Sequence, residues 1–232
     1  MRHPKQTGSG LVEVMVAITI GLLLLSVLVM IFTSTKLAQS NQSGLAQLQD
    51  NQRTAMTMIN TIVQSAGYYP SPQTQGATDA LPASGVFAAG QSITGTSGTS
   101  NASDTLTVRF ATAPGDGILN CNGTSNAGSS NTIYINQFAV NNNQLTCALN
   151  SGAAQPLVDG VSKMTVLYGV DTNGNGSVNQ YFSASTLPPG AAVRSVKVTL
   201  TMVNPLANQV QVAAQGTSSL TVSWVIGVMN QL

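Results

Sequence analysis

A long apolar segment near the N-terminus, Leu11–Phe32, constrains the fold of this chain more than any other feature of its sequence. It contains one acidic residue, Glu13, and it follows a short basic stretch that holds Arg2 and Lys5. An apolar segment of about 20 residues is long enough to cross a bilayer as a helix. A carboxylate inside such a segment is costly in lipid, and this marks Glu13 as a functional candidate.

The chain is predicted to stay helical well beyond the membrane segment. Over residues 37–67, apolar residues recur at steps of three and four, which indicates one face of an amphipathic helix. No proline occurs between Ser9 and Tyr69, so one helix of roughly 87 Å is expected from Ser9 to Ala66. Gly67 is the expected stop, because glycine readily adopts the left-handed conformation that ends helices.

The C-terminal part, residues 68–232, is predicted to form a β-rich domain. Residues 71–103 are rich in Ser, Gly, Thr, Ala and Pro, and we expect a long surface loop there, with only a weak strand candidate at 85–88. Alternating apolar residues predict strands in the remainder, at 104–112, 132–140, 144–149, 161–170, 178–183, 193–203 and 220–228. Their antiparallel sheet needs an apolar cover, which the amphipathic helix supplies, so the expected fold class is α+β.

The last two predicted strands specify which side chains face the sheet interior. In 193–203, the residues expected inward are Val196, Val198, Leu200 and Met202. Those expected outward are Ser195, Lys197, Thr199 and Thr201. In 220–228, the expected inward residues are Leu220, Val222, Trp224, Ile226 and Val228.

Two cysteines, Cys121 and Cys147, lie in this polar part of the chain. In an exported protein such a pair predicts a disulfide bond. The alternative is two free buried thiols in a cytosolic protein, and the membrane segment argues against it.

The residues around the start of the apolar segment resemble a known processing signal. Gly8-Ser9-Gly10-Leu11-Val12-Glu13, followed by a long apolar helix, is similar to the class III signal of type IV prepilins. The resemblance implies that a membrane-bound prepilin peptidase cuts after Gly8 on the cytoplasmic side and that Ser9 becomes the N-methylated first residue. Glu13 then corresponds to the family's fifth-position glutamate. The family usually has Phe where this chain has Ser9.

This setting gives Glu13 a physical role. An ionised carboxylate buried in an apolar bundle needs a positive partner, and the methylated amino terminus of a neighbouring helix would supply one. The alternative is a glutamate that stays at the membrane edge and reaches water. Basic residues before the segment predict a cytoplasmic N-terminus, with the rest of the chain in the periplasm before it joins an extracellular pilus.

A second resemblance, to the PilW group of minor pilins, covers much of the remaining chain. It is carried by Arg53, Ser65–Tyr68, Asn120-Cys121, Leu145–Cys147, Tyr168–Gly176 and Val193–Val198. The resemblance implies a low-abundance subunit that joins other minor pilins at the pilus tip. Major pilins and an inner-membrane assembly platform are further expected partners. The subunit would prime assembly of a type IV pilus, in the context of twitching motility, adhesion or DNA uptake.

Two other functions stay open at this point. A pseudopilin of a type II secretion system would share the leader, the helix and the fold. A membrane-anchored surface binding protein, with 71–103 as its contact region, would instead keep an uncut N-terminus.

The composition argues against an enzyme and against nucleic-acid binding. The only histidine is His3, which lies in the leader, so the mature chain has no imidazole for nucleophilic or metal chemistry. Only 6% of the residues are charged, and cleavage at Gly8 leaves no basic patch to neutralise phosphates. We expect no cofactor.

One further motif, at residues 171–177, begins like a calcium-binding loop. Asp171, Asn173 and Asn175 occupy its first three ligand positions, but Phe182 stands where a bidentate glutamate is required. Asn and Gly are also the residues that a tight turn between strands requires. We therefore predict a turn and no metal site, with the calcium loop as the alternative.

Overall fold

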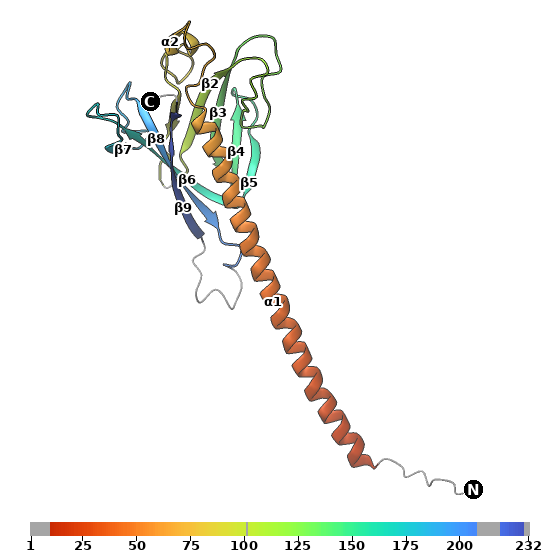
Figure 1. Ribbon diagram of the computed structural model, residues 1–232. Coiled ribbons are helices and arrows are strands. Elements are labelled where there is room, and N and C mark those ends of the chain that lie inside the picture. The colour runs from red at the N-terminus through yellow and green to blue at the C-terminus, as the bar shows by residue number, and fades with distance from the viewer. Residues whose placement is uncertain (1–9, 101, 208–218, 230–232) are drawn as a thin grey trace. The chain divides into compact units, whose positions relative to one another are not determined.

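The computed structural model describes residues 10–100, 102–207 and 219–229 of the chain. The chain divides into two compact units, Met1–Ala46 and Gln47–Leu232, and the boundary falls inside the first helix. The described N-terminal unit consists of that helix, whereas the C-terminal unit combines the end of the helix with two antiparallel sheets (Figure 1). The predicted α+β fold class, a long N-terminal helix with antiparallel β-structure, is confirmed.

Helix α1 spans Leu11–Gln64 without a break, as the lack of proline predicts. Beyond its last turn the chain reverses at Gly67, whose φ of 75° is in the left-handed region. The backbone N–H of Gly67 donates to the carbonyl of Arg109 at 3.1 Å, which attaches the helix exit to a strand. The predicted continuous helix and its glycine stop are confirmed, while Ser9 lies outside the described residues.

Among the described residues of the C-terminal unit, nine strands form two antiparallel sheets. The first sheet has the order β1-β2-β3-β4-β5, with β1 at Ile93–Thr96, β2 at Thr105–Thr112, β3 at Thr132–Asn141, β4 at Gln144–Leu149 and β5 at Gln155–Asp159. The second has the order β7-β6-β8-β9, with β6 at Val161–Val170, β7 at Gln180–Phe182, β8 at Val193–Val203 and β9 at Ser219–Gly227. A single turn of helix, α2 at Ala77–Ala80, precedes β1.

The hairpin between β3 and β4 shows how the turn chemistry sets the register. Asn142 and Asn143 have φ values of 50° and 58°, the positive pair that a two-residue hairpin turn requires. Asn141 then faces Gln144, and Phe138 faces Cys147. This turn was expected from the three consecutive asparagines and is confirmed.

The end of α1 and both sheets share one hydrophobic core within the C-terminal unit. Ala55, Ile59 and Val63 repeat at four-residue steps and are completely buried. They belong to the same buried cluster as Phe110 of the first sheet and Val198 of the second. Burial of each large apolar side chain stabilises the fold by roughly 1.5–3 kcal/mol, so this stripe holds the last turns of α1 to the sheets.

The two sheets are also connected through the backbone of β6. The N–H of Met164 donates to Oγ of Ser103 at 2.6 Å, and the N–H of Val166 donates to Oδ2 of Asp104 at 2.8 Å. The N–H of Asp104 donates in turn to the carbonyl of Met164 at 2.9 Å. Ser103 and Asp104, just before β2, therefore form hydrogen bonds with backbone groups of β6 on the side that does not face β8.

The prediction of a surface loop over 71–103 is wrong in part. The segment contains α2 and strand β1, and it buries Leu81, Phe87 and Ile93. The few apolar residues that are buried are difficult to recognise among the many small and polar residues of this segment. Its structure depends on a residue from another part of the chain. That residue is Arg109 of β2.

Several strand predictions also need correction. The single predicted sheet is two sheets, and β5 was missed because Pro156 interrupts its pattern. Strand β7 is only three residues long. Ser195 is buried rather than outward, since Tyr181 lies over it with its hydroxyl 3.3 Å from Ser195 Oγ. On β9, Leu220 is 40% exposed although it was expected inward.

Candidate functional site

The first turn of α1 holds the acidic residue that the sequence singles out. The backbone N–H groups of Glu13 and Val14 donate to the carbonyl of Gly10 at 2.9 and 3.3 Å, which starts the helix. Glu13 lies in this first turn, where a carboxylate interacts favourably with the positive end of the helix dipole. The predicted cleavage residues Gly8 and Ser9 lie outside the described residues.

The apolar segment that follows is exposed to its surroundings on every side. All its large hydrophobic side chains from Leu11 to Phe32 are at least 46% exposed, so no described part of the chain covers them. By length and composition α1 is apolar enough to cross a membrane. A surface of this kind needs lipid or the apolar surface of other helices as its environment.

The few hydroxyl groups in this segment make local hydrogen bonds. Thr19 donates to the carbonyl of Val16 at 2.8 Å, and Ser26 donates to that of Leu23 at 2.7 Å. Such bonds let a polar side chain sit in an apolar medium at small cost. The carboxylate of Glu13, by contrast, has no counter-ion or hydrogen-bond donor within residues 10–100, 102–207 and 219–229. Glu13 is therefore the one charged side chain of this segment that still needs a partner.

The two cysteines are joined in a disulfide bond. Cys121, in the loop before β3, and Cys147, in β4, are both buried. The backbone N–H of Cys121 also donates to Oδ1 of Asn136 at 2.8 Å, which places this loop against β3. The bond links two neighbouring elements of the C-terminal unit Gln47–Leu232, which we call the head, and its role is to stabilise the head.

The calcium-like motif at Asp171 forms a turn in which its own backbone supplies the donors. Oδ1 of Asp171 accepts the N–H of Gly174 at 2.7 Å, and Oδ2 accepts that of Gly176 at 2.7 Å. Burial alone would raise the pKa of Asp171, but these N–H bonds outweigh it and lower that pKa. Arg194 Nε lies 3.8 Å from Oδ2.

The two asparagines of the motif accept backbone N–H groups as well. Oδ1 of Asn173 accepts the N–H of Asn175 at 3.3 Å, and Oδ1 of Asn175 accepts that of Ser177 at 2.9 Å. The three side chains thus act as acceptors for the turn. The described residues contain no cluster of three or more His, Cys, Asp or Glu side chains suited to a metal ion.

Sequence reasoning missed the most unusual buried group, Arg109 in the middle of β2. Its side chain is completely buried. The guanidinium donates to the carbonyls of Gln91 at 2.5 Å, Pro82 at 2.6 Å, Ala88 at 2.6 Å and Leu81 at 3.1 Å. Burial lowers the pKa of Arg109. The signal available in the sequence was a single charged residue in a strand that otherwise alternates. In the structure, its guanidinium holds residues 81–91 in place.

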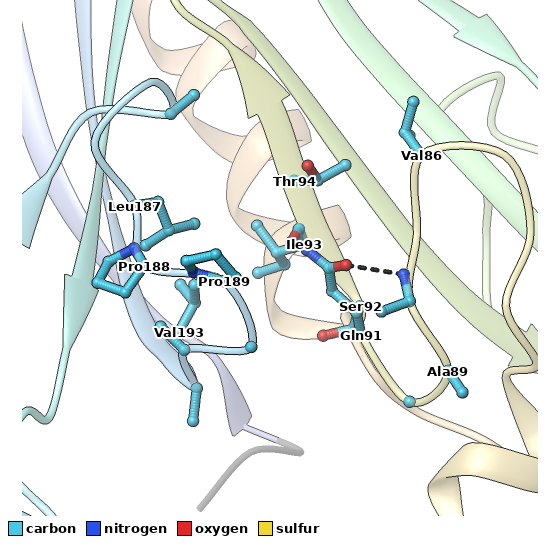
Figure 2. A pocket seen from close by; sticks show the side chains of 16 residues that line it. Val86, Ala89, Gln91, Ser92, Ile93, Thr94, Leu187, Pro188, Pro189 and Val193 are labelled. Carbon is cyan, nitrogen blue, oxygen red and sulfur yellow. Dashed lines mark hydrogen bonds between the residues drawn. The ribbon is translucent and has the colours of Figure 1, made fainter.

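A cleft of about 590 Å³ lies between the segment before β1 and the loop that leads into β8. Figure 2 shows Ile93 and Thr94 on one wall and Leu187, Pro188 and Pro189 on the other. Its lining is uncharged. The amide of Gln91 crosses this region, accepting the N–H of Ala88 at 2.9 Å and donating to the carbonyl of Ile93 at 3.1 Å.

Comparison with protein families gives two matches. The family described as "Type IV Pilus-assembly protein W" (PilW) matches residues 125–225, and the "Prokaryotic N-terminal methylation motif" matches residues 3–29. Residues 125–225 of the chain are thus similar to PilW, and residues 3–29 are similar to the prepilin-type methylation motif. The methylation motif includes the predicted cleavage residues and Glu13, and the PilW match includes Cys147, the Asp171 turn and most of the second sheet.

Two solved structures are similar to this chain. A type IV-like pilin from Thermus thermophilus is 14% identical, with 80% of this chain and 99% of that chain covered and a TM-score of 0.49. A binary complex of two pseudopilins from the type 2 secretion system of Vibrio vulnificus gives 11% identity, coverages of 81% and 94%, and a TM-score of 0.42. Both scores lie below 0.5, too low to assign a fold on their own. The search of curated proteins finds no significant match.

Proposed function

We propose that this chain is a minor pilin that helps to prime assembly of a type IV pilus. The PilW match over residues 125–225 and the methylation motif at the N-terminus support membership in a pilus-assembly system. The observation that carries the proposal is an apolar helical segment, Leu11–Phe32, whose large side chains are all exposed and whose first turn holds one carboxylate, Glu13, without a partner among the described residues.

In this proposal the exposed apolar segment has two successive environments. It first lies in the inner membrane, with the N-terminus in the cytoplasm and the head in the periplasm, as the basic residues before Leu11 favour. It then packs against the equivalent helices of other minor and major pilins when the assembly platform draws the subunit into a filament. The surface that binds lipid in the first environment binds helices in the second.

Glu13 sets the position of the subunit in this second step. Cleavage after Gly8 by prepilin peptidase creates a new amino terminus at Ser9, and methylation leaves its positive charge in place. When helices pack in an apolar medium, an ionised carboxylate and an amino terminus on adjacent helices each provide the charge that the other lacks. Their pairing fixes the axial offset between neighbouring subunits.

A complementation experiment in the native host tests this function. Deletion of the gene is expected to abolish or greatly reduce surface pili, and the wild-type chain is expected to restore them. Glu13→Val is expected to be processed and membrane-inserted normally but to fail to restore pili, whereas Glu13→Asp restores them in part. Normal piliation with Glu13→Val would remove the role given to Glu13, and normal piliation in the deletion strain would contradict the proposed function itself.

A further inference from the structure

In the described part of the head, the two sheets end in four strand edges, and three of these edges are protected against pairing with another chain. An unprotected edge presents free N–H and C=O groups that pair readily with a foreign strand. Strand β7 is only three residues long, and β5 carries Pro156 and Asp159 next to an irregular register in β4. Strand β1 has four residues, and the Gln91 side chain binds the carbonyl of Ile93.

The fourth edge, that of β9, has none of these protective features. Strand β9 spans nine residues, Ser219–Gly227, with no charged residue and no proline. Its pairing with β8 runs from Ser219 to Gly227 without a register shift. At about 3.4 Å per residue, the edge is roughly 30 Å long. Among the described residues, no other strand pairs with it.

The hydrogen bonds of β9 show which backbone groups point outward. The N–H of Val228 donates to the carbonyl of Arg194 at 2.8 Å, which makes these two residues a hydrogen-bonded pair. Because bonded and non-bonded pairs alternate in an antiparallel ladder, Val222 and Trp224 bond to β8. The N–H and C=O groups of Thr221, Ser223 and Val225 therefore point away from β8. These three residues define what we call the outer edge of β9.

The side chains along this strand are also incompletely covered. Val225 is 55% exposed and Leu220 is 40% exposed, and Val222 and Trp224 are only half-buried at the margin of the core. The indole Nε1 of Trp224 is buried without an acceptor in the described part of the chain. Buried Trp N–H groups usually find a partner, and the described residues supply none to Trp224.

We propose that the outer edge of β9 is a docking site for an extended, uncharged segment of another polypeptide, which adds to the second sheet as a fifth strand. Backbone groups of the added strand pair with Thr221, Ser223 and Val225. Its alternate apolar side chains extend the cover over Leu220 and Val222. The lack of any charge on β9 sets the chemistry of the occupant, because a charged strand would lose hydration there without gaining a partner.

The test uses the full chain in detergent micelles and a synthetic peptide, acetyl-Thr-Val-Thr-Val-Thr-Val-Thr-amide. Amide hydrogen exchange is followed residue by residue by NMR. In the free chain, the outer-edge amides of Thr221, Ser223 and Val225 are expected to exchange faster than those of Val222 and Trp224. At a peptide concentration about ten times Kd, exchange at the outer edge is expected to slow about tenfold.

Matched controls separate strand addition from nonspecific apolar binding. A peptide N-methylated at alternate residues keeps the side chains but loses the edge hydrogen bonds, and it is expected not to protect the outer edge. Ser223→Pro removes one outward N–H without affecting the bonds to β8, and it is expected to abolish protection, whereas Ser223→Ala retains it.

Three results would overturn the proposal. One is outer-edge amides that are already protected in the free chain, because the edge is then covered by the chain itself or by a second copy. Another is no change in exchange with the unmodified peptide. The third is equal protection by the N-methylated peptide, which keeps the test decisive even if Ser223→Pro fails to fold.

Discussion

The guanidinium of Arg109 lies over the ring of Phe87, with 4.6 Å between its Cζ and the ring centroid. This contact joins the middle of a buried strand to a segment that has little regular structure of its own. The same guanidinium donates to four carbonyls of residues 81–91, so one side chain satisfies backbone groups that a helix or sheet would normally satisfy. The fold of that segment therefore depends on β2.

Replacement of Arg109 by Met is expected to reduce the free energy of unfolding by at least about 3 kcal/mol, because it leaves several buried carbonyls without donors. Arg109→Lys is expected to recover only part of the loss, since an ammonium cannot reproduce the planar fork. Urea unfolding of the full chain in detergent measures both. A loss below about 1 kcal/mol for Arg109→Met would show that the segment folds without it.

The disulfide between Cys121 and Cys147 is expected to stabilise the head through its effect on the unfolded chain. The double variant Cys121→Ser/Cys147→Ser should lose about 3–4 kcal/mol of unfolding free energy, as a loop of this length predicts. Thermal unfolding with and without reductant measures the effect, and the double variant serves as its own control. If reductant lowers the Tm of the double variant as much as that of the wild type, the loss does not come from this bond.

Substitution of Tyr168 by Phe is expected to leave the free energy of unfolding unchanged or to raise it, unlike the substitutions above. Its hydroxyl is completely buried and has no hydrogen-bond partner among the described residues, and this burial, with the nearby charge of Asp104, raises the pKa of Tyr168. Tyr168→Phe removes an unsatisfied polar atom and keeps the ring, so stability is expected to stay the same or to rise by about 1 kcal/mol. Tyr168→Leu, which leaves a cavity, is expected to destabilise. A clear loss with Tyr168→Phe would reveal a hydrogen bond of this hydroxyl.

The Asp171 turn should contribute to the acid sensitivity of the head. The pKa of Asp171 is lowered in the folded chain, so its contribution to stability is complete above the unfolded pKa of about 3.9. That contribution is lost as the pH falls through the lower folded value. Urea midpoints measured from about pH 6 down to about pH 2 should therefore fall more steeply for the wild type than for Asp171→Asn. Parallel curves for the two proteins would contradict the role of these N–H bonds.

The sequence predicted those parts of the molecule that depend on local pattern. The helix, its stop at Gly67 and the Asn142-Asn143 turn follow from periodicity, the absence of proline and positive φ, all of which are local. The alternation in β8 predicted its buried residues from Val196 to Met202 for the same reason.

The errors concern residues whose environment is set by distant parts of the chain. The sequence of residues 71–103 is typical of a loop, and their structure becomes clear only from their hydrogen bonds to Arg109. Ser195 is expected to be exposed, and only the fold shows that Tyr181 lies over it. The way the two sheets join depends on the contact of Ser103 and Asp104 with β6, about 60 residues away in sequence, which no pattern within a strand can show.

The N-terminal residues of the candidate site were also predictable from the local sequence, but for a different reason. Glu13 and the apolar segment were recognisable because a charge in a membrane-length segment is physically costly. Within residues 10–100, 102–207 and 219–229 no group pairs with Glu13, and the partner proposed for it is the amino terminus of a neighbouring subunit, which the fold of one subunit does not contain.

The mass of the mature protein tests the central claim most directly. Intact-mass analysis of the chain extracted from membranes of its native host is predicted to show a protein that begins at Ser9 and carries one methyl group on its amino terminus. This result would place the free amino terminus four residues before Glu13, as assembly through that carboxylate requires. An N-terminus that still carries residues 1–8 would contradict the account and favour a membrane-anchored binding protein instead.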